Sequence, residues 1–207
     1  MRMGAIAILI PAAGASSRMR GTDKLTQQIA GEPLLRRQAR RACAVGAHVV
    51  VTLPDHLHPR ARALSGLPVQ PVAIPDSAEG MAASLRRAVG MMPRGFDGVM
   101  ILPADMPEID EADMQALVDS FYRSPHPMVQ QGTAEDGTPG HPVLFPADCI
   151  PALRGLTGDA GAREVLHANS HRLRRIPLPG RHAVTDLDTP EAWEDWRRET
   201  GEPCAAE

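Results

Sequence analysis

Two cationic side chains follow a run of small residues near the start of the chain. Residues 9–25 have the sequence LIPAAGASSRMRGTDKL, in which Arg18 and Lys24 come after an apolar run at 5–10. An apolar run that ends in small residues and glycine indicates a buried strand entering a loop. Small side chains let backbone N–H groups approach an anion, and the two cations add positive charge there. The segment therefore predicts a polyphosphate-binding loop, here called the phosphate loop (residues 11–24).

The phosphate loop lacks two common phosphate-binding motifs. No Gly-Lys-Ser or Gly-Lys-Thr triplet closes it, which excludes a Walker loop. The second and third glycines of the dinucleotide fingerprint are also missing, which excludes that motif.

Carboxylates occur where they could hold a metal ion opposite the phosphate loop. Asp105 follows the apolar run Val99–Leu102, and ligands of open α/β sheets bind at the carboxyl ends of strands. Because Mg²⁺ binds one or two carboxylates together with phosphate oxygens, Asp105 is a candidate ligand. The alternative is a turn or capping aspartate ahead of Pro107. A second candidate lies in Asp186-Leu187-Asp188, whose two carboxylates point to one face if the segment is extended.

Asp188 has an alternative role. Residues 188–191, Asp-Thr-Pro-Glu, combine a capping residue, a proline in the first turn and a glutamate three residues on, as at a helix start. Asp188 is therefore a candidate helix cap as well as a candidate ligand, whereas Asp186 has no such alternative. The residues themselves do not separate the two.

The elements that position these residues alternate along the first half of the chain. Strands are predicted at Ala5–Ile10, His48–Leu53, Gln70–Ile74 and Val99–Leu102, with helices at Pro33–Ala44, His58–Leu64 and Met81–Val89. Strand–helix alternation indicates right-handed βαβ units and a mostly parallel sheet. Further on, the patterns predict helices at Asp110–Tyr122 and Thr189–Arg198 and a hairpin of Met128–Gln131 and Pro142–Phe145.

These elements predict an α/β fold: a single-domain, Rossmann-like, doubly wound, mostly parallel sheet with a small hairpin insertion. A chain of 207 residues is long enough to bury a core of this size. We expect the domain to span residues 1–200, and residues 201–207 to form a disordered tail.

Composition excludes several classes of protein. A net charge of −3 and an aromatic content of 3% do not favour nucleic-acid binding. No segment is long enough for a transmembrane helix. Two arginine groups are expected on solvated faces: Arg36, Arg37, Arg40 and Arg41, and Arg172, Arg174 and Arg175. Three scattered cysteines (Cys43, Cys149 and Cys204) fit neither a metal site nor a disulfide framework, which predicts a cytoplasmic location.

Five segments, in order along the chain, carry a resemblance to a known family. They are the phosphate loop, Pro103-Ala104-Asp105-Met106-Pro107, residues 140–145 (Gly-His-Pro-Val-Leu-Phe), 158–163 (Gly-Asp-Ala-Gly-Ala-Arg) and 186–191. Over roughly residues 5–198 the chain resembles the molybdenum cofactor cytidylyltransferase family of the MobA-like nucleotidyltransferase superfamily. It departs from the family pattern at Arg20, which stands before Gly21 and makes the loop one residue longer.

The resemblance implies roles for the matching residues. Those implied for catalysis are Arg18, Lys24 and Asp105. Those implied for nucleotide binding are Ala12, Ala13, Gly14, Ser17, Arg18 and Lys24, with Gly80 and Ser84 from a base-recognition segment at 77–85. Asp105 with Asp186 or Asp188 would bind Mg²⁺. The acceptor-binding residues implied are Gly140, His141, Pro142, Asp159 and Arg163. Alternatives stay open for Ser84 as an ordinary helix residue, His141 as a structural histidine and Arg163 as a helix-surface arginine.

The implied reaction transfers CMP from CTP to the phosphate of molybdopterin, the organic part of the molybdenum cofactor, and releases pyrophosphate. An ionised acceptor phosphate needs no general base, so catalysis would depend on positioning and charge neutralisation. The choice of cytosine depends on Ala12-Ala13-Gly14, since guanylyl-transferring relatives typically have Ala-Gly-Gly there and the extra methyl narrows the base pocket.

Three alternative functions remain. The first is guanylyl transfer to the molybdenum cofactor, and the second is cytidylyl transfer to an isoprenoid or sugar phosphate. The third is a non-catalytic chaperone that delivers the cofactor to a client molybdoenzyme. Intact Arg18, Lys24 and Asp105 argue against the chaperone.

Overall fold

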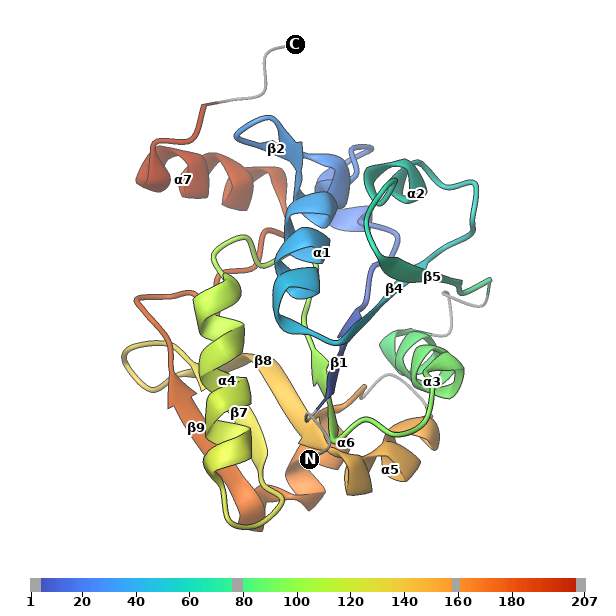
Figure 1. Cartoon of the computed structure of the whole chain (residues 1–207). Helices are drawn as coiled ribbons and strands as arrows, with labels where there is room; N and C mark the ends of the chain where they lie inside the picture. Colours follow the sequence, from blue (N-terminus) through green and yellow to red (C-terminus); the bar gives the residue numbers. More distant parts are fainter. Residues whose placement is uncertain (1–4, 76–79, 158–160, 204–207) are drawn as a thin grey trace.

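Seven strands form one sheet, in the order β5-β4-β1-β6-β8-β7-β9 (Figure 1). The computed structural model describes residues 5–75, 80–157 and 161–203. Within the described sheet, β8 runs antiparallel to β6 and β7, and the other pairings are parallel. The strands are β1 (Ile6–Ile10), β4 (His48–Leu53), β5 (Val69–Ala73), β6 (Gly98–Ile101), β7 (Val129–Thr133), β8 (Pro139–Pro146) and β9 (Leu173–Pro177), and a separate ribbon pairs β2 (Gln28–Ile29) with β3 (Glu32–Pro33).

The observed strands confirm the predicted α/β fold. β4 has the predicted bounds, and β1, β5 and β6 differ from the prediction by one residue at one or both ends. The predicted hairpin is formed by β7 and β8, which lie inside the main sheet between β6 and β9. β9 is not among the predicted strands; it is an edge strand on which Arg174 and Arg175 are exposed, as expected for a solvated face.

Helices cover both faces of the sheet (Figure 1). α1, α4 and α7 contribute to one apolar cluster, and α3, α5 and α6 contribute to the other. Since α5 and α6 have five and six residues, they are too short to give a periodic pattern in the sequence. The helices are α1 (Leu34–Val45), α2 (Pro59–Ala63), α3 (Met81–Met91), α4 (Glu111–Arg123), α5 (Ile150–Arg154), α6 (Arg163–Ala168) and α7 (Pro190–Thr200), with 3-10 turns η1 (Ser17–Met19), η2 (Lys24–Thr26), η4 (Ala147–Cys149) and η5 (Ser170–Arg172).

Alternate residues of the central strand β1 belong to opposite layers of the core. Ile6, Ile8 and Ile10 lie in the cluster with α1 and α4, while Ala7 and Leu9 lie in the cluster with α3 and α5. All five are buried. Burial on both faces explains why this strand is a continuous apolar run in the sequence.

The parallel strands end at one edge of the sheet, and the loops that follow them hold most of the predicted site residues. The phosphate loop follows β1, and Asp105 follows β6. Because β8 runs in the opposite direction, its first residues, Gly140 and His141, lie at the same edge. This carboxyl edge lies toward α2, β2 and α7 (Figure 1).

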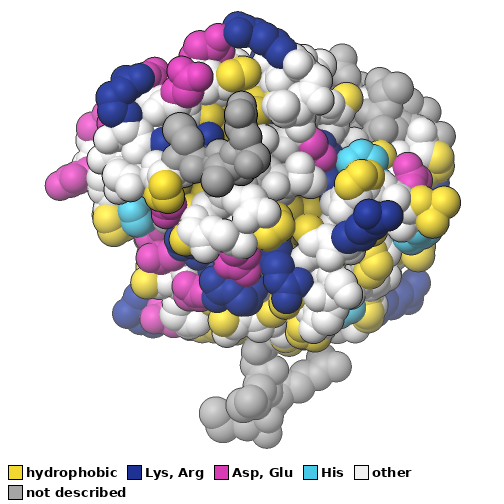
Figure 2. All heavy atoms as spheres, turned by 90° about the horizontal axis from the view of Figure 1, so that it is seen from above, with side chains coloured by type: hydrophobic (Ala, Val, Ile, Leu, Met, Phe, Trp, Pro, Cys, Tyr) yellow, Lys and Arg dark blue, Asp and Glu magenta, His cyan; other side chains and the backbone are white. Residues whose placement is uncertain are grey.

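Figure 2 shows the molecule from above, the side on which α2, β2 and α7 lie in Figure 1. Acidic and basic side chains are interspersed over this face. A nucleic-acid-binding protein would present one broad basic surface, and the described residues do not form one on this face.

Two sequence expectations concern the ends and helices of the chain. Within the described residues, no helix combines the length and apolar character needed to cross a bilayer. In the predicted tail, Glu202 accepts a hydrogen bond from the backbone N–H of Ala30 at 3.2 Å, and residues 204–207 lie outside the described residues.

Candidate active site

Four charged side chains from three separate segments form a network at the carboxyl edge of the sheet. The Lys24 ammonium lies 2.5 Å from both a carboxylate oxygen of Asp105 and one of Asp188. Arg18 contacts the other Asp188 oxygen at 2.7 Å. The Lys24, Asp105 and Asp188 side chains are only 17%, 20% and 18% exposed, whereas Arg18 is 70% exposed. The fold thus assembles the predicted cations and two of the predicted carboxylates at one point.

The loop that carries Asp105 is fixed by α1. Arg41 donates hydrogen bonds to the carbonyl oxygens of residues 107 and 109, at 2.8 and 2.7 Å, and Gln38 donates to that of Met106. Both side chains are buried. The prediction that Arg41 lies on a solvated face is therefore wrong: the loop after β6 has unpaired carbonyls, and Arg41 satisfies them.

Asp188 reaches the network because its neighbour Leu187 is fixed against the loop of Asp105. Leu187 is buried, and its backbone N–H donates to the Asp105 carbonyl oxygen at 3.0 Å. The cap of α7 is Thr189, whose side-chain oxygen accepts from the N–H three residues on. The alternative role of Asp188 as the helix cap is therefore wrong, and its carboxylate faces the two cations instead.

Asp186 takes a different position from Asp188. It is exposed, and within the described residues it makes no ion pair with Lys24 or Arg18. Its charge acts on His141 instead. Of the two candidates, Asp188 is the one placed beside Asp105.

The network favours the charged forms of Asp188 and Lys24. Burial disfavours ionisation of Asp188, but hydrogen bonding and charge from Lys24, with the charge of Arg18, outweigh burial and lower its pKa. Burial likewise disfavours the charged form of Lys24, but Asp105 and Asp188 outweigh it and raise the pKa of the ammonium. Lys24 is also the only lysine in the sequence, so a compact point charge stands here where every other cation of the chain is an arginine.

The phosphate loop has left-handed backbone conformations at residues other than glycine, which the sequence does not predict. Ser16 and Arg20 are left-handed, each with φ 51°, and Gly21 follows with φ 99°. Arg20 ends the 3-10 turn η1, and its side chain points to Glu191 at 2.6 Å. The extra residue is accommodated by the two successive positive φ angles of Arg20 and Gly21.

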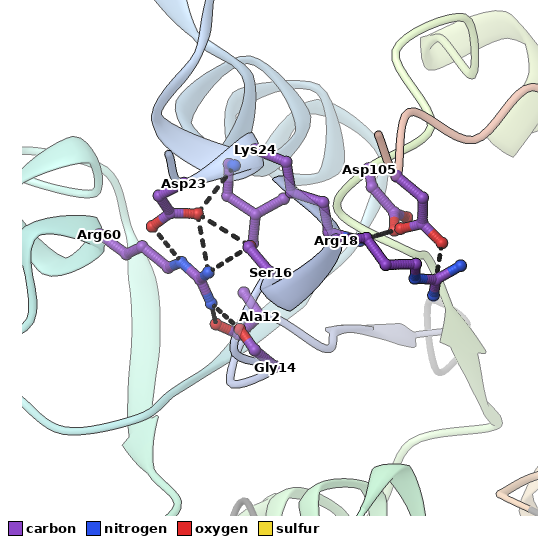
Figure 3. Close-up of polar contacts among 10 residues, drawn as sticks. Ala12, Gly14, Ser16, Arg18, Asp23, Lys24, Arg60 and Asp105 are labelled. Atoms are coloured by element: carbon purple, nitrogen blue, oxygen red, sulfur yellow. Dashed lines mark hydrogen bonds and ion pairs between the residues drawn. The ribbon is translucent and has the colours of Figure 1, made fainter. Parts of the chain in front are cut away.

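Arg60, from α2, binds the backbone of the phosphate loop. Its side chain is 2% exposed and donates to the backbone carbonyl oxygens of Ala12 and Gly14 at 2.6 and 2.7 Å. It also donates to the Ser16 hydroxyl at 2.9 Å and forms a two-point ion pair with Asp23 at 2.7 Å (Figure 3). Sequence reasoning missed Arg60; the only signal is a helix start at Pro59, which does not indicate burial.

A cleft of about 530 Å³ lies over the phosphate loop, lined by residues 13–17, residues 21–23, Pro54, His58 and Arg60. Within the described residues, the backbone N–H groups of Ala13, Gly14, Ala15 and Ser16 have no protein acceptor. A Cβ added to Gly14 would meet no atom within 4 Å, so this glycine leaves open space. Free N–H groups and open space are what an incoming phosphate requires.

Two of the acceptor candidates lie close to the segment that carries Asp186 and Asp188. His141 donates its backbone N–H to the Ala183 carbonyl oxygen at 2.8 Å, and a Cβ on Gly140 would lie 1.9 Å from that oxygen. His141 Nδ1 is buried and has no partner within the described residues. Burial lowers the pKa of His141, and the charges of Asp105 and Asp186 oppose this only in part. His141 is therefore a neutral polar group near Asp105. Pro142 follows it as a buried residue of β8.

Among the described residues, Gly80, Ser84 and Arg163 make no contact with the network. Gly80 precedes α3 with φ 94°, which favours glycine, and Ser84 is 5% exposed in the first turn. Arg163 is exposed at the start of α6. Asp159 and residues 77–79 of the base-recognition segment lie outside the described residues. The roles of these residues stay predictions.

The residues of the network fit a divalent cation that arrives with a triphosphate. Asp105 and Asp188 offer carboxylate oxygens, the hard donors that Mg²⁺ prefers, around a point already held by a cation. In the described part of the chain, no group of three or more His, Cys, Asp or Glu residues is placed to hold a metal. Two carboxylates leave most coordination positions to phosphate oxygens and water, as is usual for Mg²⁺ in nucleotide sites.

Comparison with protein families agrees with this geometry. Residues 8–174 match the model of the MobA-like NTP transferase domain. The chain belongs to this family. It is thus a nucleotidyltransferase, with the phosphate loop, Asp105 and most of the sheet inside the matched region.

Two relatives and one solved structure match this MobA-like transferase along most of their length. The purine catabolism protein PucB of Bacillus subtilis (strain 168) is 29% identical over 202 residues, 90% of this chain and 93% of PucB. A molybdenum cofactor guanylyltransferase of Cupriavidus metallidurans is 28% identical over 185 residues, 87% of this chain and 89% of the relative. The crystal structure of Rv0371c from Mycobacterium tuberculosis H37Rv has a TM-score of 0.77 at 25% identity and covers 96% of this chain and 98% of that one.

Proposed function

We propose that this nucleotidyltransferase transfers CMP from CTP to the phosphate of molybdopterin, giving the cytosine dinucleotide form of the cofactor and pyrophosphate. The observation that carries the proposal is the network in which Lys24 lies between Asp105 and Asp188, beside the open phosphate loop. This arrangement offers cations and N–H groups to a triphosphate and carboxylates to its metal ion.

In the proposed reaction an oxygen of the acceptor phosphate attacks the α-phosphorus of CTP. The bond from that phosphorus to the bridging oxygen breaks, and pyrophosphate leaves with the electron pair. Arg18 and Lys24 neutralise the charge that accumulates on the leaving group, and the free N–H groups of the phosphate loop bind phosphate oxygens. No side chain has to remove a proton, because the acceptor phosphate is already ionised.

Mg²⁺ is part of the proposal. Asp105 and Asp188 would hold it, whereas Asp186 makes no ion pair with Lys24 or Arg18 within the described residues. When bound, Mg²⁺ would supply charge neutralisation and fix the orientation of the phosphates.

The choice of CTP is supported by Ala13, whose methyl group stands where guanylyl-transferring relatives have glycine. Ala13 is 3% exposed and belongs to the lining of the cleft. Its methyl group therefore reduces the room for a base in a tightly packed place. A guanylyl reaction is the second candidate, because relatives from two organisms are named molybdenum cofactor guanylyltransferases.

The acceptor side is supported by the position of Gly140 and His141 at the carboxyl edge, near Asp105. The molybdenum cofactor appears in the names of two relatives, which favours a pterin phosphate over a sugar or isoprenoid phosphate. Delivery of the product to a client molybdoenzyme would follow the reaction.

The test is product analysis. The purified chain is incubated with molybdopterin, Mg²⁺ and one nucleoside triphosphate at a time, and the products are separated by chromatography and weighed by mass spectrometry. We expect cytosine dinucleotide and pyrophosphate with CTP. A guanine dinucleotide from GTP would overturn the cytidylyl choice, and nucleotide binding without any product would favour the non-catalytic chaperone.

A further inference from the structure

Arg60 joins the two ends of the phosphate loop, although it lies outside that loop in the sequence. At the near end it donates to the carbonyl oxygens of Ala12 and Gly14, and at the far end it pairs with Asp23. Its guanidinium is almost completely buried, with 2% exposed. Figure 3 shows the side chain pointing into the loop, with these partners on its two sides.

We infer that Arg60 is a positioning residue for the nucleotide, which holds the phosphate loop in the shape that receives a triphosphate. The inference rests on the proposed nucleotide transfer, and it assigns a role to a side chain that lies outside the loop in the sequence and binds the loop's backbone.

Arg60 acts first on the direction of the loop's backbone groups. A carbonyl oxygen that faced the cleft would repel a phosphate, because both carry negative charge. Arg60 donates hydrogen bonds to the carbonyl oxygens of Ala12 and Gly14 and thereby keeps them from repelling a phosphate. The N–H groups of residues 13–16 stay without a protein acceptor within the described chain. The loop therefore presents backbone N–H donors, and not carbonyl oxygens, to an incoming phosphate.

Arg60 also acts on the position of Lys24, through Asp23. Asp23 accepts the N–H of Leu25 at 3.0 Å and thereby caps the 3-10 turn in which Lys24 lies. Because Arg60 fixes both carboxylate oxygens of Asp23, it also fixes the start of that turn. One side chain therefore sets the position of the loop's donors and of its lysine relative to each other.

Only arginine can make this set of contacts. Its planar guanidinium donates in a fixed fork to a carboxylate on one side and to carbonyl oxygens on the other. A lysine has the same charge but a single ammonium, which cannot reach all of these acceptors together. Charge and geometry can thus be separated by substitution.

The experiment compares Arg60→Lys and Arg60→Met with Arg62→Lys and Arg62→Met. Arg62 lies on the same short helix but is exposed, which makes it a matched control. Binding of CTP, and separately of GTP, with Mg²⁺ is measured by calorimetry at a temperature where circular dichroism shows every variant folded.

We expect the Kd of the bound nucleotide to rise about tenfold or more in both Arg60 variants, the scale of a lost charged hydrogen bond. The Arg62 variants should stay within about twofold of wild type, as usual for surface substitutions. In steady-state kinetics, the KM for nucleotide should rise in the Arg60 variants while the KM for the acceptor does not. An unchanged nucleotide Kd in folded Arg60→Met would overturn the inference, since a purely structural role lowers only stability.

Asp23→Asn serves if the Arg60 variants do not fold. Asparagine keeps the cap of the 3-10 turn but removes the charge that Arg60 pairs with, so nucleotide binding should weaken several-fold while the fold persists. Unchanged binding in Asp23→Asn would then count against the inference. Wild-type binding of GTP in place of CTP would overturn the proposed base but leave the role of Arg60 measurable with GTP, whereas a wild-type chain that bound neither nucleotide would overturn both.

Discussion

The backbone N–H of Leu187 donates a hydrogen bond to the backbone carbonyl oxygen of Asp105 at 3.0 Å, across 82 positions of the chain. This bond aligns two loops from different parts of the chain. It places Asp188, the next residue, where its carboxylate and that of Asp105 meet on Lys24. A main-chain contact thus places one of two similar aspartates in the network.

Asp105→Asn and Asp188→Asn should each lower kcat by about a hundredfold or more, because a neutral amide holds Mg²⁺ poorly. Asp186→Asn should lower it by no more than about fivefold, since an exposed charge contributes about 1 kcal/mol at most. Initial rates at saturating substrates check this.

Thr189→Ala is the control for this series. It should cost about 1 kcal/mol of unfolding free energy through the lost helix cap and leave kcat nearly unchanged. A large loss of kcat in Asp186→Asn together with an active Asp188→Asn would show that the ligand is Asp186.

Lys24→Met should lower the melting temperature in EDTA, because Asp105 and Asp188 then face each other without a counter-charge. Added Mg²⁺ should raise the melting temperature of this variant more than that of wild type, since the ammonium no longer competes with the ion for the two carboxylates. Calorimetric melting curves with and without Mg²⁺ measure the difference.

The same competition can be seen directly in the wild-type chain. Lys24 is the only lysine, so lysine-specific ¹³C labelling gives one side-chain signal. Its chemical shift should change when Mg²⁺ is added at neutral pH. A shift that is insensitive to Mg²⁺, with equal stabilisation of wild type and Lys24→Met, would contradict a metal ion at Asp105 and Asp188.

Gly14→Ala should keep the fold and weaken nucleotide binding. A Cβ at this position meets no protein atom within 4 Å, so the added methyl group would occupy the cleft itself. Gly90→Ala is the matched control, because it is also free of neighbours within 4 Å but lies in α3. It should stabilise the helix by about 0.5–1 kcal/mol and leave binding unchanged. Equal nucleotide affinities in the two variants would place the nucleotide elsewhere.

Asp23→Asn should make the free energy of unfolding depend less on pH in the acidic range. Burial opposes ionisation of Asp23, but hydrogen bonding and charge from Arg60 outweigh it and lower its pKa below 3.8. The unfolded chain then binds more protons between the two pKa values, so the stabilisation is complete above pH 3.8 and is lost as the pH falls through the folded-state pKa.

Relative to wild type, Asp23→Asn should thus lose about 1.5–3 kcal/mol of unfolding free energy at pH 7, the scale of a charged hydrogen bond. The difference should shrink below pH 3.8. Urea unfolding at several pH values measures it. Asp195→Asn, which removes an exposed ion pair with Arg198, should show little difference at any pH. A deficit in Asp23→Asn that stayed constant into acid would mean that the Asp23 charge does not stabilise the fold.

Much of the fold follows from local patterns that the sequence contains. Apolar runs predict β1, β4, β5 and β6 to within a residue. For β1, β4 and β6 the reason is that strands buried on both faces are mostly apolar. The phosphate loop is equally local, since small residues and two cations occur within one segment. Asp105 could be predicted for the same reason, because it is the first acidic residue after an apolar strand.

Other features depend on tertiary contacts that no local pattern contains. Asp188 joins the site and Asp186 does not, because Leu187 is buried and bonded to the Asp105 carbonyl, and because Thr189 already caps α7. Arg60 lies in α2 and Arg41 in α1, and arginines on helices are ordinarily solvated. Only the loops packed against them supply the carbonyl oxygens that make their burial possible. The sequence by itself therefore determined most strands of the sheet and the small residues and cations that the phosphate loop contains. The tertiary structure decided which charges meet, because charged groups choose partners by distance in space, and that distance is set by packing between segments far apart in the chain.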